Sequence, residues 1–137
     1  KILMQVLMIK ILMSFLSMWL TMAGCASGAK GVESLSAAEF EALLARDAAV
    51  QLVDVRRASE YASGHIGEAL LIDVMAPNFT ERAAKELDPQ RPVAVYCRSG
   101  KRSLRAAQLL REAGFTKVYN LKAGYLGWEK YQASKKR

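Results

Sequence analysis

A cysteine followed by a short cationic loop is the stretch of this sequence best suited to chemistry. Cys97 follows the apolar run Val93–Tyr96, and the next five residues contain Gly100 and three cationic side chains, namely Arg98, Lys101 and Arg102. A thiolate is a good nucleophile and a thiol is a poor one, and nearby positive charge favours the thiolate. The loop therefore predicts a reactive cysteine whose chemistry is nucleophilic and covalent.

The same loop predicts a cradle for a small anion beside the sulfur. If Gly100 adopts a backbone conformation that residues with a side chain rarely adopt, the N–H groups of the loop can all point at one small anion. The helix expected to begin near Arg102 would add the positive end of its dipole. The alternative from the residues alone is a structural cysteine at a strand end, because free cysteines often serve as small apolar core residues.

Apolar runs that alternate with helical patterns must position this loop. The sequence predicts strands over 50–55, 69–73, 93–96 and 117–121, and helices over 36–45, 58–63, 77–87, 102–113 and 124–131. Ser36 and Glu39 have the spacing of a capping box at the first of these helices. The pattern predicts an α/β fold, a small open parallel sheet of four to five strands with helices on both faces. Ligands of such sheets bind at the carboxyl ends of the strands, where Cys97 lies.

The N-terminal stretch has the composition of an export signal. Lys1 and Lys10 are the only charged residues before Lys30, and 14 uncharged residues, 11–24, precede Cys25. This run fits the apolar region of a signal peptide and is short for a membrane-spanning helix, which needs about 20 residues.

The end of that stretch, Met22-Ala23-Gly24-Cys25, resembles a bacterial lipobox, in which the cysteine becomes the lipidated N-terminus. We therefore expect a signal peptide over 1–24, lipidation at Cys25 and a tether over 25–33. The protein would then be periplasmic or in the cell envelope, attached to the membrane through its N-terminal lipid. A plain secretory peptide and a retained membrane anchor are the alternatives.

The counts of cysteine and histidine narrow the chemistry. The chain has two cysteines, so lipidation of Cys25 would leave Cys97 as an unpaired and reactive thiol without a resolving partner. His65 is the only histidine, and a single histidine beside an apolar residue is more often structural than catalytic. One histidine and one free cysteine argue against a zinc site, and we expect neither metal nor cofactor.

The net charge of +7 favours a small anionic ligand over a polyanion. Three of the cations belong to the loop and three to a basic tail over 133–137, which leaves the remaining surface close to neutral. The sequence has no stripe of basic and aromatic residues of the kind that binds nucleic acid.

Three stretches together resemble the rhodanese-type sulfurtransferases. They are Leu52-Val53-Asp54-Val55-Arg56 with Glu60-Tyr61-Ala62-Ser63-Gly64-His65-Ile66, the loop Cys97-Arg98-Ser99-Gly100-Lys101-Arg102-Ser103, and the segment from Val118 to Trp128. The resemblance covers residues 34–132 and implies a rhodanese-like domain. It also implies that Asp54 and Arg56 lie next to the cysteine loop, where we expect them to be mainly architectural.

The resemblance implies transfer of sulfane sulfur from thiosulfate or a similar donor to cyanide or a thiol, through a persulfide on Cys97. The loop residues would bind the anionic donor. The three cations that neutralise it would be Arg98, Lys101 and Arg102. The residues that shape the loop and supply N–H groups would be Ser99, Gly100 and Ser103. No histidine is needed, because a preformed thiolate needs no proton acceptor.

Two other functions stay open. Phosphatases and arsenate reductases of related folds use a cysteine-to-arginine loop with five intervening residues, whereas Cys97 and Arg102 have four between them. The shorter loop suits a persulfide, whose added sulfur lies about 2.05 Å from the cysteine sulfur, better than a phosphate. The domain could instead be a persulfide carrier or a sulfide-sensing module fed by a partner protein.

Overall fold

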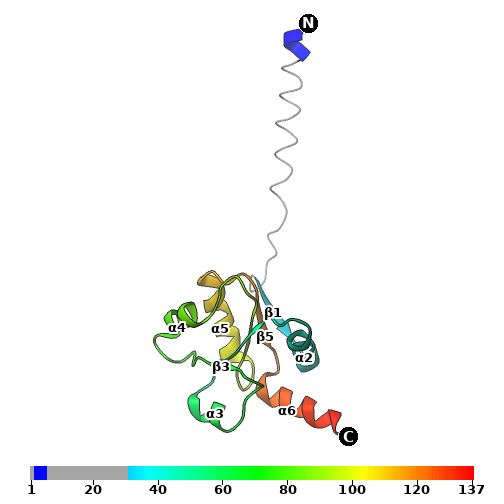
Figure 1. Ribbon diagram of the computed structural model, residues 1–137, viewed down its shortest axis with the longest axis vertical. Helices are drawn as coiled ribbons and strands as arrows, with labels where there is room; N and C mark the ends of the chain where they lie inside the picture. The colour runs from blue at the N-terminus through cyan, green and yellow to red at the C-terminus, as the bar shows by residue number, and fades with distance from the viewer. Residues whose placement is uncertain (1, 6–30) are drawn as a thin grey trace.

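The computed structural model describes residues 2–5 and 31–137 (Figure 1). The lipobox-like motif, Cys25 and most of the expected signal peptide and tether lie outside the described residues. In the described part, no helix is both long and apolar enough to cross a membrane. The elements from residue 31 onward are β1 (Val32–Leu35), α2 (Ala37–Arg46), β2 (Gln51–Asp54), α3 (Ala58–Ala62), β3 (Leu70–Leu71), α4 (Phe79–Glu86), β4 (Val93–Tyr96), α5 (Lys101–Glu112), β5 (Val118–Leu121) and α6 (Gly124–Lys135).

The strands form one parallel sheet in the order β1-β5-β4-β2-β3, which confirms the predicted α/β fold. All four residues of β4 are buried, as expected of a central parallel strand covered on both faces. Val95 of β4 lies between Val53 of β2 and Asn120 of β5. The carboxyl ends of the three central strands therefore meet at one edge of the sheet, directly before Cys97.

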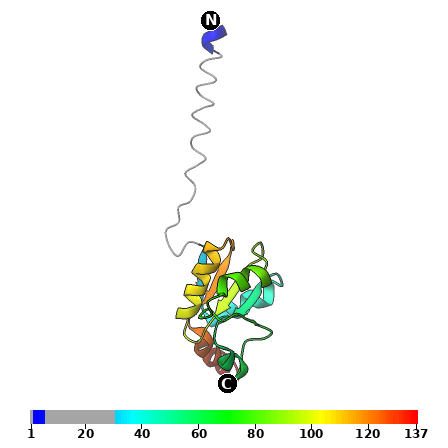
Figure 2. The same cartoon turned by 90° about the vertical axis from the view of Figure 1, so that its left-hand side faces the viewer.

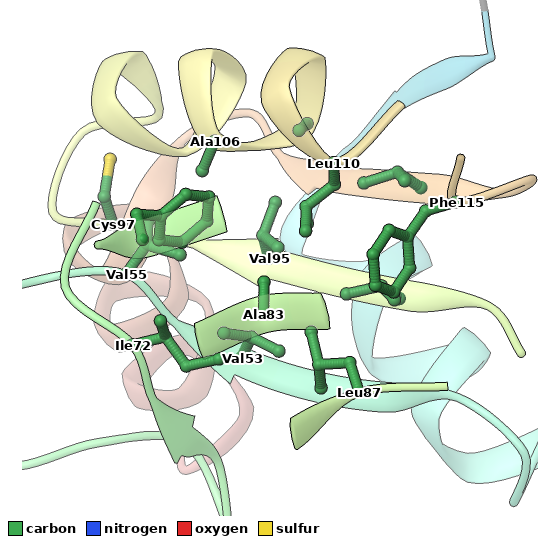
Figure 3. Close-up of a cluster of buried hydrophobic side chains, with 14 residues drawn as sticks. Val53, Val55, Ile72, Ala83, Leu87, Val95, Cys97, Ala106, Leu110 and Phe115 are labelled. Atoms are coloured by element: carbon green, nitrogen blue, oxygen red, sulfur yellow. The ribbon is translucent and has the colours of Figure 1, made fainter. Parts of the chain in front are cut away.

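Two hydrophobic clusters cover the two faces of the sheet. The first joins the sheet to α4 and α5 through residues such as Val95, Ala83 and Leu110, and Figure 2 views the molecule from this side. Figure 3 shows Cys97 at one end of this cluster, beside the first turns of α5. The second cluster packs α2 and α6 on the opposite face, where Phe40 meets Trp128 edge to face. The loop after β4 thus follows a strand that is covered on both faces.

The capping box predicted for the first helix of this domain, α2, is present. The Glu39 amide donates to Ser36 Oγ over 3.2 Å, and the Ser36 amide donates to Glu39 Oε1 over 3.0 Å. Reciprocal bonds of this kind satisfy two amides that the start of a helix leaves unpaired. They fix the point at which the chain turns from β1 into α2.

The regular structure extends further at both ends than the sequence predicted. The strand β1 begins at Val32, inside the expected tether, and pairs with β5 from Val32↔Val118 onward. At the other end, α6 continues to Lys135, inside the expected basic tail. Lys135 Nζ lies 2.6 Å from Glu41 Oε2 of α2, and that ion pair gives the last turn of α6 a partner.

Candidate active site

The backbone of Gly100 shapes the loop between β4 and α5. Gly100 has φ +97° and is the N-cap of α5, so it adopts the left-handed conformation that the sequence led us to expect. A Cβ atom at this position would collide with the carbonyl oxygen of Lys122. The loop therefore needs glycine here both for its conformation and for its close approach to the turn after β5.

Hydrogen-bond donors converge on the sulfur of Cys97. The Gly100 amide lies 3.1 Å from Cys97 Sγ, and the Ser103 hydroxyl lies 3.3 Å from it. Burial alone would raise the pKa of Cys97, but hydrogen bonds from the Ser103 hydroxyl and from the amides of Ser103, Ser99 and Gly100 outweigh burial and lower that pKa. The thiolate is favoured mainly by neutral donors fixed in the backbone and in the first turn of α5.

The three loop cations do not form a closed ring around the sulfur. Arg102 binds Glu60 of α3 in a bidentate pair, with Nη1–Oε1 at 2.9 Å and Nη2–Oε2 at 3.0 Å. This pair raises the pKa of Arg102, burial opposes the rise, and the charges of Glu60 and Cys97 add to it. Arg98 and Lys101 are exposed. The charge of Arg102 interacts with that of Cys97, and Arg102 is already paired with a carboxylate.

The start of α6 holds the loop from behind. The amide of Tyr125 donates to the carbonyl oxygen of Cys97 over 2.8 Å, and the amide of Leu126 donates to that of Arg98 over 3.2 Å. Gly124 has φ +65°, and a Cβ atom there would collide with the backbone of Arg98. The loop is therefore fixed between two helix starts, one facing the sulfur and the other facing the loop carbonyls.

Asp54 and Arg56 form a buried ion pair beside the loop. Arg56 Nη2 lies 2.6 Å from Asp54 Oδ2, and the two residues are 3% and 0% exposed. The same nitrogen donates to the carbonyl oxygen of Gly64 over 2.7 Å, and the guanidinium lies over the ring of Tyr125 at 4.4 Å. The pair thus connects the end of β2 to the turn after α3 and to α6.

Two openings lie next to the loop, although Cys97 itself is buried with 0% exposure. The first has a volume of about 370 Å³ and is lined by Arg57, Glu60, Met75, Arg98 and Arg102. The second has a volume of about 290 Å³ and is lined by Arg56, Glu60, Ser63, Gly64, Arg98, Tyr125, Leu126 and Glu129. Arg98 and Glu60 belong to both, whereas Lys101 lines neither.

Sequence reasoning missed Glu60, Arg57 and Met75 as lining residues of the first opening. The position of Arg57 offered a signal, because it is the second of two arginines after β2. Met75 offered none, because nothing in its neighbourhood along the chain relates it to Cys97. His65 lines neither opening. Its ring stacks on Tyr61 with centroids 3.8 Å apart, and its Nδ1 lies 3.0 Å from the Tyr61 carbonyl oxygen.

No metal-binding group of three or more histidine, cysteine or acidic side chains occurs within residues 2–5 and 31–137. The chemistry that this arrangement supports is nucleophilic attack by a hydrogen-bonded thiolate next to a cationic opening. The sulfur has no exposed surface in this conformation, so neighbouring side chains must move before a donor can reach it.

Comparison with known proteins finds relatives with different names, one of which is a sulfurtransferase. A "Sulfurtransferase" of Allochromatium vinosum is 35% identical over 82 residues, which cover 60% of this chain and 74% of that protein. "Uncharacterized protein YqhL" of Bacillus subtilis is 41% identical over 78 residues, or 57% of this chain and 60% of that protein. A "tRNA uridine(34) hydroxylase" of Chlamydia trachomatis is 38% identical over 82 residues, but these are 25% of its length. The match thus spans less than two thirds of the last two proteins.

Solved structures agree with the fold. The human single-domain sulfurtransferase TSTD1 is 31% identical and superposes with a TM-score of 0.59 over 71% of this chain and 95% of its own. The sequence profile of the family described as "Rhodanese-like domain" matches residues 36–131, which include every strand except β1 and the whole cysteine loop. The chain therefore belongs to the rhodanese-like domain family.

Proposed function

We propose that this protein is a sulfurtransferase that moves sulfane sulfur from thiosulfate or a similar donor to cyanide or a thiol through a persulfide on Cys97. One observation carries the proposal: Cys97 Sγ accepts hydrogen bonds from the Gly100 amide and the Ser103 hydroxyl at the start of α5. These donors favour a sulfur that is negatively charged before any substrate binds. The sulfurtransferase relatives supply independent support for sulfur transfer.

In the first step, the Cys97 thiolate attacks the outer sulfur of thiosulfate. A new S–S bond forms to Cys97, the S–S bond of thiosulfate breaks, and its electron pair leaves with sulfite. The three negative charges of the reactants are then divided between the persulfide and sulfite. In the second step, the acceptor attacks the outer sulfur of the persulfide and returns Cys97 to the thiolate. Two displacements through one covalent intermediate predict ping-pong kinetics.

The residues of the loop divide this work. Gly100 and Ser103 hold negative charge on the sulfur, because their donors already point at it. Arg98 and Arg102 line the first opening and neutralise the incoming anion. Ser99 contributes its amide to the sulfur, and Lys101 acts at longer range because it lines neither opening.

Intact-mass analysis after addition of thiosulfate tests this function. We expect the chain to gain one sulfur atom, to lose it on addition of cyanide, and to gain none as Cys97→Ser. If thiosulfate adds no sulfur while an aryl phosphate is hydrolysed, the oxyanion alternative replaces this proposal.

The burial of Cys97 favours a persulfide carrier as the second candidate function. A thiol with no exposed surface reacts slowly with a free donor unless a partner protein displaces the side chains around it. A carrier would form the persulfide once and release it slowly, whereas an enzyme would release sulfite continuously. Comparing the first turnover with steady-state sulfite release distinguishes the two.

We also propose that the protein is exported and attached to the membrane by a lipid at Cys25. The support is the sequence Met22-Ala23-Gly24-Cys25 after an uncharged stretch. In a bacterial host, the full chain should incorporate labelled palmitate and partition into detergent, and Cys25→Ser should do neither. Unlabelled wild-type protein would contradict lipidation.

A further inference from the structure

The two openings beside the loop differ in the charge of the side chains around them. Three arginines and one glutamate line the first, which gives it a net positive charge that suits an anionic donor. The second is lined by two arginines and two glutamates, namely Arg56, Arg98, Glu60 and Glu129. The formal charges of these four side chains cancel, so the second opening suits a ligand that carries charge of both signs.

Two of these four charges already have partners. Arg56 Nη2 lies 2.6 Å from Asp54 Oδ2, and both residues are buried. Glu60 holds Arg102 in the bidentate pair, whose shorter contact is 2.9 Å. A ligand that paired with Arg56 or Glu60 would have to replace an existing partner, so neither charge is well suited to bind it.

Arg98 and Glu129 are the other two charges of this opening. Neither has an ion-pair partner among residues 2–5 and 31–137, and the two do not pair with each other. Both side chains are exposed. The start of α6 fixes their relative position, because the Leu126 amide donates to the Arg98 carbonyl oxygen over 3.2 Å and Glu129 lies three residues further along the same helix face. One cation and one carboxylate thus line the same opening without a partner in the described part of the chain.

The second opening has room for a small organic molecule. Its volume of about 290 Å³ equals that of roughly ten water molecules in the liquid, each of which occupies about 30 Å³. Leu126 is 42% exposed and supplies apolar surface to this opening. A small zwitterion with a short carbon skeleton matches this combination of two opposite charges and an apolar wall.

We propose that Glu129 is a specificity-determining residue for the sulfur acceptor and binds the ammonium group of an aminothiol in the second opening. The inference rests on the sulfur transfer proposed above. An amino-acid thiol such as cysteine would place its ammonium group at Glu129 and its carboxylate at Arg98. The anionic donor and the aminothiol acceptor would then be recognised in different openings of one site.

The chemistry of this half-reaction takes place between two sulfur atoms. The acceptor thiolate attacks the outer sulfur of the Cys97 persulfide. An S–S bond forms to the acceptor, the bond between the outer sulfur and Cys97 Sγ breaks, and its electron pair returns to Cys97. The two negative charges of the reactants become one on the acceptor persulfide and one on the Cys97 thiolate. Glu129 takes no part in these bond changes and acts only by holding the acceptor.

The decisive measurement is kcat/KM for the acceptor, with thiosulfate as donor, in the wild type and in Glu129→Gln. Sulfite leaves before the acceptor binds in a ping-pong reaction, so this quantity reports the second displacement alone. Loss of the carboxylate should lower it about threefold to fivefold for cysteine and cysteamine, as expected for two charges about 4 Å apart in water. It should not lower the values for 2-mercaptoethanol and 3-mercaptopropionate, which lack an ammonium group. Equal losses for all four thiols, or no loss for the two aminothiols, would overturn the proposal.

Two further variants complete the experiment. Glu112→Gln is the matched control, because Glu112 is an exposed acid at the far end of α5 from Cys97, and it should leave all four values unchanged. If it reproduces the losses of Glu129→Gln, net charge explains them and the proposal fails. Arg98→Gln should lower the values for cysteine and 3-mercaptopropionate but not for cysteamine, which has no carboxylate. An equal loss for cysteamine would contradict the placement of the acceptor between the two charges.

Intact-mass analysis separates this inference from the function on which it rests. If thiosulfate adds no sulfur to Cys97, the proposed sulfur transfer fails. If thiosulfate adds sulfur, and cysteine removes it at the same rate from the wild type and from Glu129→Gln, sulfur transfer stands and recognition by Glu129 fails.

Discussion

Two groups of atoms surround Cys97, and they differ in burial and in charge. The inner group consists of neutral donors, the Gly100 amide and the Ser103 hydroxyl, which lie 3.1 and 3.3 Å from the sulfur on buried residues. The outer group consists of charged side chains on exposed or half-buried residues around the first opening, namely Arg57, Glu60, Arg98 and Arg102.

This difference separates the ionisation of the sulfur from the choice of its donor. Buried donors fixed by the backbone act on Cys97 at all times and are little affected by salt. Exposed cations act mainly on an approaching anionic ligand, and dissolved ions screen their charges. Changes to the inner group should therefore alter the pKa of Cys97 and kcat, whereas changes to the outer group should alter KM.

The largest expected effect comes from Gly124→Ala, which displaces the inner group and keeps every charge of the outer group. The new Cβ collides with the backbone of Arg98, and alanine disfavours the positive φ of this position. We expect a loss of about 2 kcal/mol or more in the free energy of unfolding and at least tenfold in kcat. Thermal unfolding and steady-state kinetics measure the two.

Gly114→Ala is its matched control. Gly114 also has a positive φ, +99°, but a Cβ there meets no atom within 4 Å. It should lose about 1 kcal/mol of stability and keep the wild-type kcat. If both glycine variants have the same kcat, the close contact between Gly124 and the loop is unimportant for catalysis.

Ser103→Ala tests the inner group directly. It removes a hydrogen bond to a charged sulfur, worth about 1.5–3 kcal/mol, and should raise the pKa of Cys97 by about one unit or more. The thiolate predominates only above this pKa. At pH values below the pKa, the variant should therefore have about tenfold lower activity than the wild type, and the difference should disappear as the pH rises. Ser99→Ala keeps the amide that Ser99 gives to the sulfur and should leave the pH profile unchanged. An unchanged profile for Ser103→Ala would show that the hydroxyl does not control ionisation.

Arg98→Gln tests the outer group. The guanidinium of Arg98 lines both openings, so its loss should raise the KM for thiosulfate about threefold by an exposed Coulomb interaction. The pKa of Cys97, measured from the pH dependence of its alkylation, should stay the same. Lys101→Gln, which removes the same charge from a residue that lines neither opening, should change KM less. If Arg98→Gln shifts the pH dependence of alkylation, the outer group also controls the pKa of Cys97 and the two groups do not have separate roles.

The smallest expected effect is that of salt on the wild type. Raising the ionic strength from about 0.1 M to about 1 M shortens the screening length from about 10 Å to about 3 Å. The KM for thiosulfate should rise about twofold, and the pKa of Cys97 should not change, because its hydrogen-bond donors are buried. If the KM and the pKa of Cys97 both changed with ionic strength, exposed cations would control the ionisation of the sulfur.

Most of the fold was predictable from patterns within the chain. Buried strands such as β4 form continuous apolar runs, and the capping box marks the start of α2. The strand β1 was missed because its four residues include only two apolar ones, Val32 and Leu35, and its pairing partner β5 lies more than 80 residues away. An edge strand of this composition is stabilised by its neighbour rather than by its own sequence.

The candidate site likewise has features that local sequence predicts and features that depend on distant residues. The positions of Cys97 and Gly100 follow from a local motif, and the conformation of Gly100 agrees with it. The pairing of Arg102 with Glu60 joins residues 42 positions apart, so sequence spacing gave no reason to assign the charge of Arg102 to a carboxylate rather than to the sulfur. The burial of Cys97 likewise depends on packing that no short segment encodes.

The pairing of β1 with β5 has a consequence for the newly made protein. Since a ribosome delivers Val32 long before Val118, the edge strand β1 has no neighbour to pair with until β5 has been made. The sheet then closes through contacts between distant parts of the chain, which slows folding. Until β5 has paired with β1 the core around Cys97 is unfinished, so oxidants and metals in the surrounding medium have their best access to this thiol before folding is complete.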